Sequence, residues 1–421
     1  MIKTYDNRTP HWSNDSEAKG KFLLFFIWPF GAWLYSLWTA NTRSSYIIFF
    51  LFSILLCWHM APMPGSEYDD FIGILDRFNS TNISSIELLT QIKNFFTLNP
   101  NAPKELYENI VIYLVKSFTD NYHIYFFICS IPVAFCQLKS LKRITSDIYF
   151  KAGNWIAILI LAMFIFPRDI ITVQNPRFTT GFWICLVSSI YCFSESRKKY
   201  YYLIPILLTP MIHSGMWLYL IIITIYVLIP HKVRLLEILV ICSIPISFFD
   251  ANLFHNLNLS FLPENLYRWS LLHFDPDNIN NQAELRSGYW WVGYSFFIAS
   301  KITYIYMIIK LINNKNNINN NQEAFNFYPF FLFNVFIVNL IQPIPVLGER
   351  YYWFIQIYTI YIWFKTFHLE NKNIILALVI TNLWGIIRRY GYILGGALSV
   401  NTDPDIFYTP LIYLIYKGFY I

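Results

Sequence analysis

Arginine and histidine side chains occur where long apolar runs of this chain meet. Arg168, Asp169 and Arg177 lie in the stretch IFPRDIITVQNPRFTTGFW, at the junction of two runs of membrane-spanning length. His213 interrupts a largely apolar run over residues 200–229. Ionisable groups at membrane depth are costly, and they usually face a cavity or a partner. The sequence therefore predicts a polar site, inside or at the edge of a helix bundle, that holds an anionic ligand.

Arg168 and Arg177, together with Asn175, carry donor groups that suit a phosphate or a pyrophosphate. A guanidinium fork matches two phosphate oxygens at once. The alternative is a structural role, in which Arg168 pairs with the adjacent Asp169 and Arg177 extends toward the membrane surface from the start of its helix. We favour ligand binding for Arg177 and the structural role for Arg168.

The pair His213–Ser214 is a second candidate. A histidine can act as a general base or hold a phosphate, and a lone histidine can equally make a hydrogen bond between helices. Both interpretations stay open. A Ser–His–acid hydrolase is not implied, because adjacent residues on a helix point in different directions.

Two further segments combine arginine with aromatic residues. Arg350 and Tyr351 follow the proline-containing segment 342–345, and Arg388 and Arg389 precede another tyrosine. Aromatic rings can lie against sugar faces while a guanidinium holds a phosphate. The alternative is anchoring of a helix end at the membrane surface. We favour binding for Arg350 and anchoring for Arg388 and Arg389, which stay candidates for substrate binding.

Acidic residues cluster in the segment Glu67-Tyr68-Asp69-Asp70. Paired carboxylates near a membrane surface can bind a divalent metal or act as a general base. Asp69 and Asp70 are therefore candidates for the base, and the alternative is a solvated loop with a capping aspartate.

Several well-known motifs do not occur in the sequence. It has no GxxxxGK[ST], GxGxxG, HExxH, GxSxG or paired CxxC, so an ATP-driven pump and a metalloprotease are unsupported. The six cysteines fall inside apolar runs and are expected to be buried, without disulfides or a metal. We expect no cofactor.

The composition indicates a membrane protein. Of 421 residues, 56% are hydrophobic and only 13% are charged, whereas soluble domains carry about 25% charged residues. Because a span needs about 20 mostly apolar residues, we expect an all-α polytopic transmembrane bundle of about 11–13 spans, with residues 1–421 forming one integral membrane domain. The first span is expected over 22–40, and 200–229 is either one kinked helix or two short helices meeting at His213.

Basic loops predict the orientation, because Lys and Arg are enriched in cytoplasmic loops. The cytoplasmic group is expected to contain 139–151, 194–199, 231–234, Lys310, Lys315, Lys365 and Lys417. This assignment places His213, the arginine segments and the loops 62–104 and 250–288 outside, and it makes 313–323 a cytoplasmic low-complexity linker. The basic N-terminal tail argues for the opposite orientation of the first two segments, and the first, broken at Pro29, is either a crossing or a re-entrant helix. The net charge of +6 is spread over loops and does not indicate nucleic acid binding.

The order of these features resembles the EpsG family of bacterial exopolysaccharide proteins, related in role to Wzy-type O-antigen and capsule polymerases. The resemblance covers roughly residues 60–365 and rests on a Tyr–Asp segment, Asn175-Pro176-Arg177, His213-Ser214 and an Arg-Tyr-Tyr at Arg350. The segment LYENIVIYLVKSFTDNYHIYFFICSIPVAFCQLKSLKRI also resembles that family. Pro176 departs from the pattern. The Glu67–Asp69 pair separately resembles the acidic signature of GT-C glycosyltransferases.

The EpsG resemblance implies a multi-pass enzyme of the bacterial inner membrane that joins oligosaccharide units carried on undecaprenyl pyrophosphate. Its implied partners are membrane lipid and a chain-length regulator, and no metal is implied. Arg177 and Arg350 would hold the pyrophosphate and stabilise its departing charge. His213, or Asp69 or Asp70, would take the proton from the attacking hydroxyl.

Three other functions compete with a polymerase. A GT-C transferase using a polyprenyl-phosphate sugar would add one sugar and depend on Glu67 or Asp69. A flippase for lipid-linked glycan would favour inverted repeats and polar groups at the membrane midplane. A membrane acyltransferase would want a deeply placed histidine, for which His213 is the candidate.

Overall fold

The computed structural model describes residues 15–61, 70–97, 99, 102–147, 149–195, 200–230, 232–249, 290–344, 347–390 and 403–420. Within these ranges the chain forms helices joined by turns and loops, and no β-strand is present, which confirms the all-α prediction. The α-helices are α1 (Ala18–Ile27), α2 (Pro29–Trp38), α3 (Arg43–Trp58), α4 (Asp70–Ser80), α5 (Ser85–Phe96), α6 (Tyr107–Lys116), α7 (Tyr122–Thr145), α8 (Trp155–Ile165), α9 (Pro176–Phe193), α10 (Ile204–Ile212), α11 (Met216–Leu228), α12 (Val233–Ser243), α15 (Trp290–Asn313), α16 (Lys315–Asn320), α17 (Gln322–Ile341), α18 (Leu347–Phe367), α19 (Lys372–Tyr390) and α20 (Leu411–Tyr420). Short 3-10 helices are η1 (Phe166–Arg168), η2 (Ile170–Gln174), η3 (Tyr200–Leu203), η4 (Ile246–Phe248) and η7 (Pro404–Phe407).

Asparagine residues begin several of the long helices. The Asn121 side chain accepts a hydrogen bond from His123 N at the start of α7, at 2.8 Å. Asn154 and Asn321 do the same for α8 and α17. An asparagine cap satisfies a backbone N–H that has no partner within the helix, typically worth about 1 kcal/mol. The asparagine-rich composition therefore has local structural uses.

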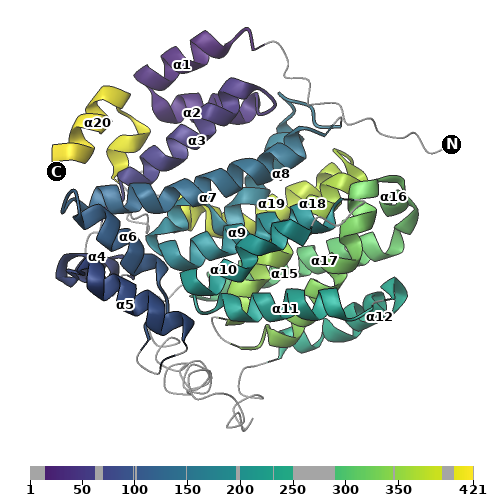
Figure 1. Ribbon diagram of the computed structural model, residues 1–421. Coiled ribbons are helices and arrows are strands. Elements are labelled where there is room, and N and C mark those ends of the chain that lie inside the picture. The colour runs from purple at the N-terminus through teal and green to yellow at the C-terminus, as the bar shows by residue number, and fades with distance from the viewer. Residues whose placement is uncertain are drawn as a thin grey trace.

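Helix α18 forms the centre of the bundle. Nearly all of its residues are buried, including Trp363 and the aromatic residues around it. A helix that is apolar on every side is typical of a position surrounded by other helices. Figure 1 shows α17 and α18 near the middle right, with α1, α2, α3 and α20 gathered at the upper left and α4 and α5 at the lower left.

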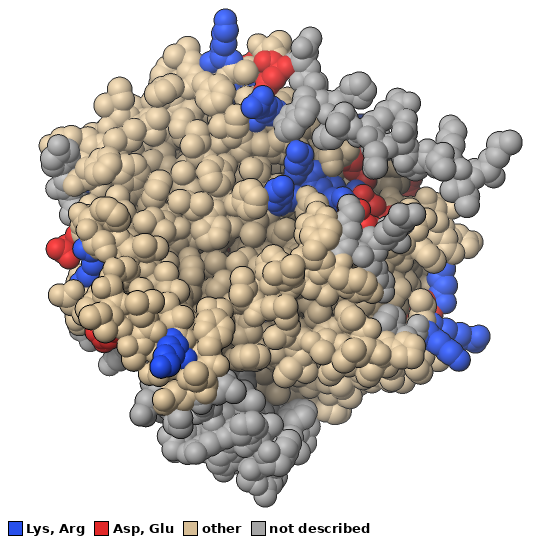
Figure 2. Space-filling view, viewed as in Figure 1, with Lys and Arg blue, Asp and Glu red and all other residues tan. Residues whose placement is uncertain are grey.

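Three described helical segments are long and apolar enough to cross a membrane, namely Tyr122–Thr145, Tyr294–Asn313 and Gln322–Ile341. Other apolar helices have 10–17 residues. Large apolar side chains are exposed on several helices, for example Leu207, Leu228 and Ile238, and Figure 2 shows a broad uncharged face with charged side chains mainly toward its edges. Such a surface suits lipid contact. The structure supports a membrane protein, and the expected 11–13 spans stay a prediction.

Helix breaks account for much of the difference between expected spans and observed helices. The first expected span, 22–40, is two ten-residue helices, α1 and α2, because the chain leaves helical geometry at Trp28 and restarts at Pro29. Region 200–229 forms two helices, α10 and α11, which meet at the extended residue His213. Of the two interpretations of that region, the second is confirmed.

Helix α7 defines the two ends of the bundle, which we call the Tyr122 end and the Thr145 end. At the Thr145 end, Lys365 Nζ lies 2.6 Å from Asp147 Oδ2 and 2.9 Å from Glu323 Oε2. Arg143 near the end of α7 also contacts Glu323, at 3.0 Å. The Lys365 side of α18 therefore lies at the Thr145 end, and α18 begins toward the Tyr122 end.

The expected position of Lys417 is wrong. Lys417 was grouped with Lys365, but it lies at the Tyr122 end, where the Asn121 side chain donates to Gly418 O at 3.2 Å. Lys417 pairs there with Asp403 and with Asp405, the latter at 2.6 Å. The loop-charge rule counts basic residues without seeing which acids neutralise them, and this explains the error.

The expected loops, the expected linker and the cysteines are the remaining predictions that can be compared with the structure. The 62–104 segment contains α4 and α5, and residues 250–288 lie outside the described part of the chain. The expected linker 313–323 contains the helix α16, because Ile318 is buried against the bundle and orders the segment. All six cysteines are free, as expected, but Cys242 is exposed on α12 and not buried.

Candidate functional site

The first turn of α9 presents Arg177. The Asn175 side chain accepts from Phe178 N at 3.5 Å, and Pro176 is the first residue of the helix. Proline suits this position because its φ angle is already helical and it has no N–H to satisfy. Asn175 therefore acts as a cap, and the Pro176 that departs from the family pattern has a local structural role. Tyr191 near the other end of α9 donates to Lys139 O of α7, so Arg177 lies toward the Tyr122 end.

Two glutamates that the sequence reasoning missed hold Arg177. Its Nη1 lies 2.9 Å from Glu105 Oε2, and its Nε lies 3.2 Å from Glu108 Oε2. Glu108 also accepts from Arg77 Nε of α4, at 2.8 Å. Glu105 precedes α6 and Glu108 lies in its first turn, so no helical spacing in the sequence pairs them.

Glu105 also binds the turn between α10 and α11. Its Oε1 accepts from Ser214 N at 2.9 Å and from Ser214 Oγ at 3.0 Å. His213 Nε2 lies 3.9 Å from the same oxygen. Tyr351 of α18 is buried and donates to Gly215 O at 2.6 Å, so it also holds this turn.

His213 is neutral at physiological pH. Burial lowers its pKa from 6.5 to about 3, and the charges of Arg350, Arg177 and Arg168 act in the same direction. Gly215 N donates to His213 Nδ1 at 2.9 Å, so the neutral ring carries its proton on Nε2. The ring can therefore offer an N–H to a ligand oxygen, while its lone pair is already engaged.

Arg168 and Arg350 approach the same aromatic ring. Each guanidinium carbon lies 5.0 Å from the centre of the Phe178 ring, and Arg168 also lies 4.5 Å from the Trp353 ring. Arg168 is buried and donates to Thr179 Oγ1, at 2.9 Å from Nη2. His213 packs edge-on against Phe178, with ring centres 5.2 Å apart. A guanidinium over an aromatic face is electrostatically favoured.

The structure thus brings together four residues that the sequence singled out: Arg168, Arg177, His213 and Arg350. We call these four, with Glu105, the arginine site. Among the other candidates, Asn175 is a cap and Tyr351 a support for the turn. Asp70 begins α4 and Arg388 and Arg389 lie in α19, but their side chains, like the whole of Asp69, lie outside the described part.

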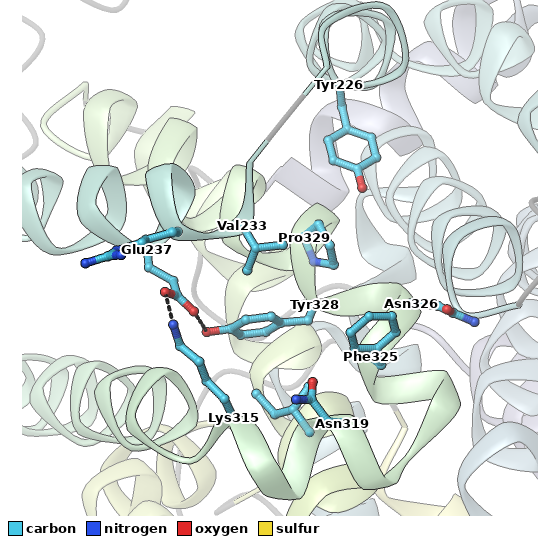
Figure 3. Close-up of a pocket in the computed structure, with 11 residues that line it drawn as sticks. Tyr226, Val233, Glu237, Lys315, Asn319, Phe325, Asn326, Tyr328 and Pro329 are labelled. Atoms are coloured by element: carbon cyan, nitrogen blue, oxygen red, sulfur yellow. Dashed lines mark hydrogen bonds and ion pairs between the residues drawn. The ribbon is translucent and has the colours of Figure 1, made fainter. Parts of the chain in front are cut away.

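No metal-binding cluster marks the arginine site in the described part of the chain. Within the described ranges, no group of three or more His, Cys, Asp and Glu side chains could hold a metal ion. A pocket of about 480 Å³ lies elsewhere, toward the Thr145 end, between α11, α12, α16 and α17. Figure 3 shows Lys315 and Tyr328 directed at Glu237 in its wall, at 2.5 and 3.1 Å. The two features are separate.

The arginine site predicts a pH effect on stability. His213 has a lower pKa when folded, so the unfolded chain binds a proton first as the pH falls. Stability should therefore decrease from pH 6.5 toward pH 3, with a slope of about one proton from this residue. Thermal unfolding of wild type and His213→Gln over this range checks the prediction. Parallel pH profiles for the two proteins would contradict it.

Gly348 permits the backbone approach that presents Arg350. A Cβ added to Gly348 would lie 2.2 Å from the Gln342 carbonyl oxygen, and backbone cannot move aside easily. Gly348→Ala should therefore cost about 1–3 kcal/mol and displace the start of α18. The midpoint of thermal unfolding measures this cost. Gly20→Ala is the matched control, because an added Cβ meets nothing within 4 Å there, and equal effects of both variants would refute the argument.

The geometry of the site is the evidence that bears on function. The charges of three arginines lower the pKa of one buried histidine, and two glutamates hold one of these arginines. No family model, no curated protein and no solved structure matches this chain.

Proposed function

We propose that this protein is a membrane glycosyltransferase that joins undecaprenyl-pyrophosphate-linked oligosaccharide units into a surface polysaccharide, as the resemblance to EpsG and Wzy-type polymerases implies. One observation carries the proposal. Arg168 and Arg350 both lie over the Phe178 ring, and His213 packs against the same ring. Arg177 is paired with Glu105, whose other oxygen lies 3.9 Å from His213 Nε2. Arg177 already pairs with Glu105 and Glu108, and three guanidinium groups close together still supply the directed N–H donors that match a ligand with several negative oxygens.

A pyrophosphate linked to a sugar fits the chemistry of these side chains. Arginine forks bind phosphate oxygens bidentately. His213 Nε2–H adds a neutral donor that does not depend on pH in the physiological range. Trp353, which is half-buried, brings aromatic surface next to Arg168, and aromatic rings suit the C–H faces of a sugar.

The proposed reaction transfers the growing chain to the non-reducing end of a new lipid-linked unit. A hydroxyl oxygen of that unit attacks the anomeric carbon, and the bond from this carbon to the pyrophosphate oxygen breaks. Arg177 and Arg350 stabilise the charge that develops on the leaving pyrophosphate. The hydroxyl proton passes to Asp69 or Asp70, because the Nδ1 lone pair of His213 accepts from Gly215. Arginine charge replaces a metal ion in this scheme.

The proposal also includes the orientation. The Thr145 end carries Lys139, Lys142 and Arg143 on α7, which favours the cytoplasmic side. The arginine site near the Tyr122 end then faces outward, where lipid-linked units are polymerised. We propose that the shorter apolar helices complete a multi-pass bundle within a single domain in the bacterial inner membrane.

A flippase for lipid-linked glycan is the second candidate, and buried polar groups between the two ends favour it. Tyr219 and Tyr358 hydroxyls lie 2.5 Å apart, and Ser189 Oγ lies 2.8 Å from Tyr219. Lys301 is buried in α15, where its Nζ donates to Ser247 O. Polar groups at mid-depth and broken helices such as α10–α11 are features of transporters.

Glycan profiles of a deletion strain separate these functions. Gel electrophoresis would compare surface glycan and lipid-linked glycan from the strain, with and without the wild-type gene. Collapse of the ladder to a single-unit band, reversed by wild type, supports a polymerase. Loss of one sugar per unit would indicate a monosaccharide transferase. Complete units trapped on the cytoplasmic side would indicate a flippase.

A further inference from the structure

Glu105 connects Arg177 on α9 to the turn that carries His213. One carboxylate oxygen contacts Arg177 Nη1 at 2.9 Å, and the other accepts two hydrogen bonds from Ser214. The same second oxygen lies 3.9 Å from His213 Nε2. Its side chain is only 10% exposed. Glu105 therefore ties the first turn of α9 to the turn between α10 and α11.

Glu108 holds Arg177 from another side. It contacts Arg177 Nε at 3.2 Å, and its other oxygen accepts from Arg77 at 2.8 Å. Glu105 accepts a hydrogen bond from Nη1, and Glu108 lies beside Nε as an ion-pair partner without a hydrogen bond to it. The Nη2 amino group is then the part of Arg177 that can be offered to a ligand.

A carboxylate in an anion site carries an electrostatic cost. Its charge repels phosphate oxygens, so Glu105 lowers the affinity that the arginines alone would provide. Orientation can outweigh this cost, because a displacement of about 1 Å in a reacting group can slow a reaction about 100-fold. His213 gains from the same anchor, since its turn is fixed by Ser214 on one side and by Tyr351 on the other.

We propose that Glu105 is a positioning residue: it holds Arg177 and the His213 turn in register, so that both present donors to one pyrophosphate in the transfer step. This inference rests on the proposed function and deepens it. Glu105 acts through Arg177 and Ser214, so its removal should harm the reaction more than the binding.

The test compares Glu105→Gln with wild type, as full-length protein purified in detergent. Undecaprenyl pyrophosphate is the binding probe, and elongation of lipid-linked repeat units is the activity. We expect the dissociation constant of the probe to be unchanged or lower, because a negative charge is removed. We expect the elongation rate to fall about 10- to 100-fold.

A matched control addresses general damage from the loss of a buried carboxylate. Glu237 is also buried and paired, with Lys315 and Tyr328, but it lies in the pocket toward the Thr145 end. Glu237→Gln should therefore leave both binding and elongation near wild-type values. A smaller change, Ser214→Ala, removes one of the Ser214 hydrogen bonds and should slow elongation less than Glu105→Gln.

Two results would overturn the inference. Elongation at the wild-type rate in Glu105→Gln would show that positioning by Glu105 is not needed. Parallel loss of probe binding and elongation would assign it a purely structural role. Failure of the proposed function is distinct, because in that case wild type itself would not elongate the glycan.

Discussion

Arg177→Ala should abolish chain lengthening while the protein is still made and inserted in the membrane. Arg177 is the arginine that both glutamates orient, and its charge acts on His213. Loss of one group that stabilises the departing charge typically costs about 100- to 1,000-fold in rate. The measurement is the length distribution of surface glycan in a deletion strain that carries the variant. Arg177→Lys should also fail, because an ammonium cannot engage two carboxylates in the fixed geometry of a guanidinium.

Two controls keep this result interpretable. Arg234→Ala removes an exposed arginine that lines the pocket near the Thr145 end, and it should leave the ladder intact. The double variant Arg177→Ala/Glu105→Gln removes both charges of the ion pair, so it should keep the protein level of Arg177→Ala and should not restore polymer. Normal long polymer from Arg177→Ala, with the variant confirmed in the membrane, would refute the role of Arg177.

Among the variants considered for stability, Lys365→Ala should cause the largest loss of folding free energy. Lys365 is 4% exposed, and it lies 2.6 Å from Asp147, which is 9% exposed, and 2.9 Å from Glu323. Removal of one partner of a buried pair leaves a carboxylate with an uncompensated charge, which costs about 3–5 kcal/mol. The midpoint of thermal unfolding in detergent measures this effect.

A double variant can show whether the stability is lost through the uncompensated charge or through the loss of side-chain packing. The double variant Lys365→Met/Asp147→Asn removes both charges and should recover most of the stability, because apolar or neutral groups of similar size can replace a buried pair. Lys310→Ala is a matched control, since Lys310 is half-buried and its amine bonds the neutral Asn371. A Lys365→Ala midpoint equal to that of Lys310→Ala would contradict the prediction.

Features that depend on residues close together in the sequence could be predicted from it. The all-α class follows from apolar runs without strand patterning. Pro29 and the His213 region were identified as interruptions, and helices do end there. The number of complete spans could not be predicted in the same way. Length and hydropathy do not show where a helix such as α8 gives way to a 3-10 turn at Pro167.

The arginine site was partly predictable, for a physical reason. Charged residues in apolar runs are conspicuous because burial is costly, and this singled out Arg168, Arg177 and His213. Glu105 and Glu108 were missed because they follow a polar loop, where a glutamate is unremarkable. Only their contacts with Arg177 identify them.

The amino-acid sequence by itself determined which groups are too costly to bury without a partner, and where local signals begin and end helices. Tertiary structure decided which partner each group meets. Lys417 illustrates this, because its acids Asp403 and Asp405 and the packing of Phe419 on Trp58 place it at the opposite end from Lys365. The tautomer of His213 likewise depends on the turn that brings Gly215 N to its ring. Ion pairing and hydrogen bonding act over a few ångströms in space, and sequence separation does not encode that distance.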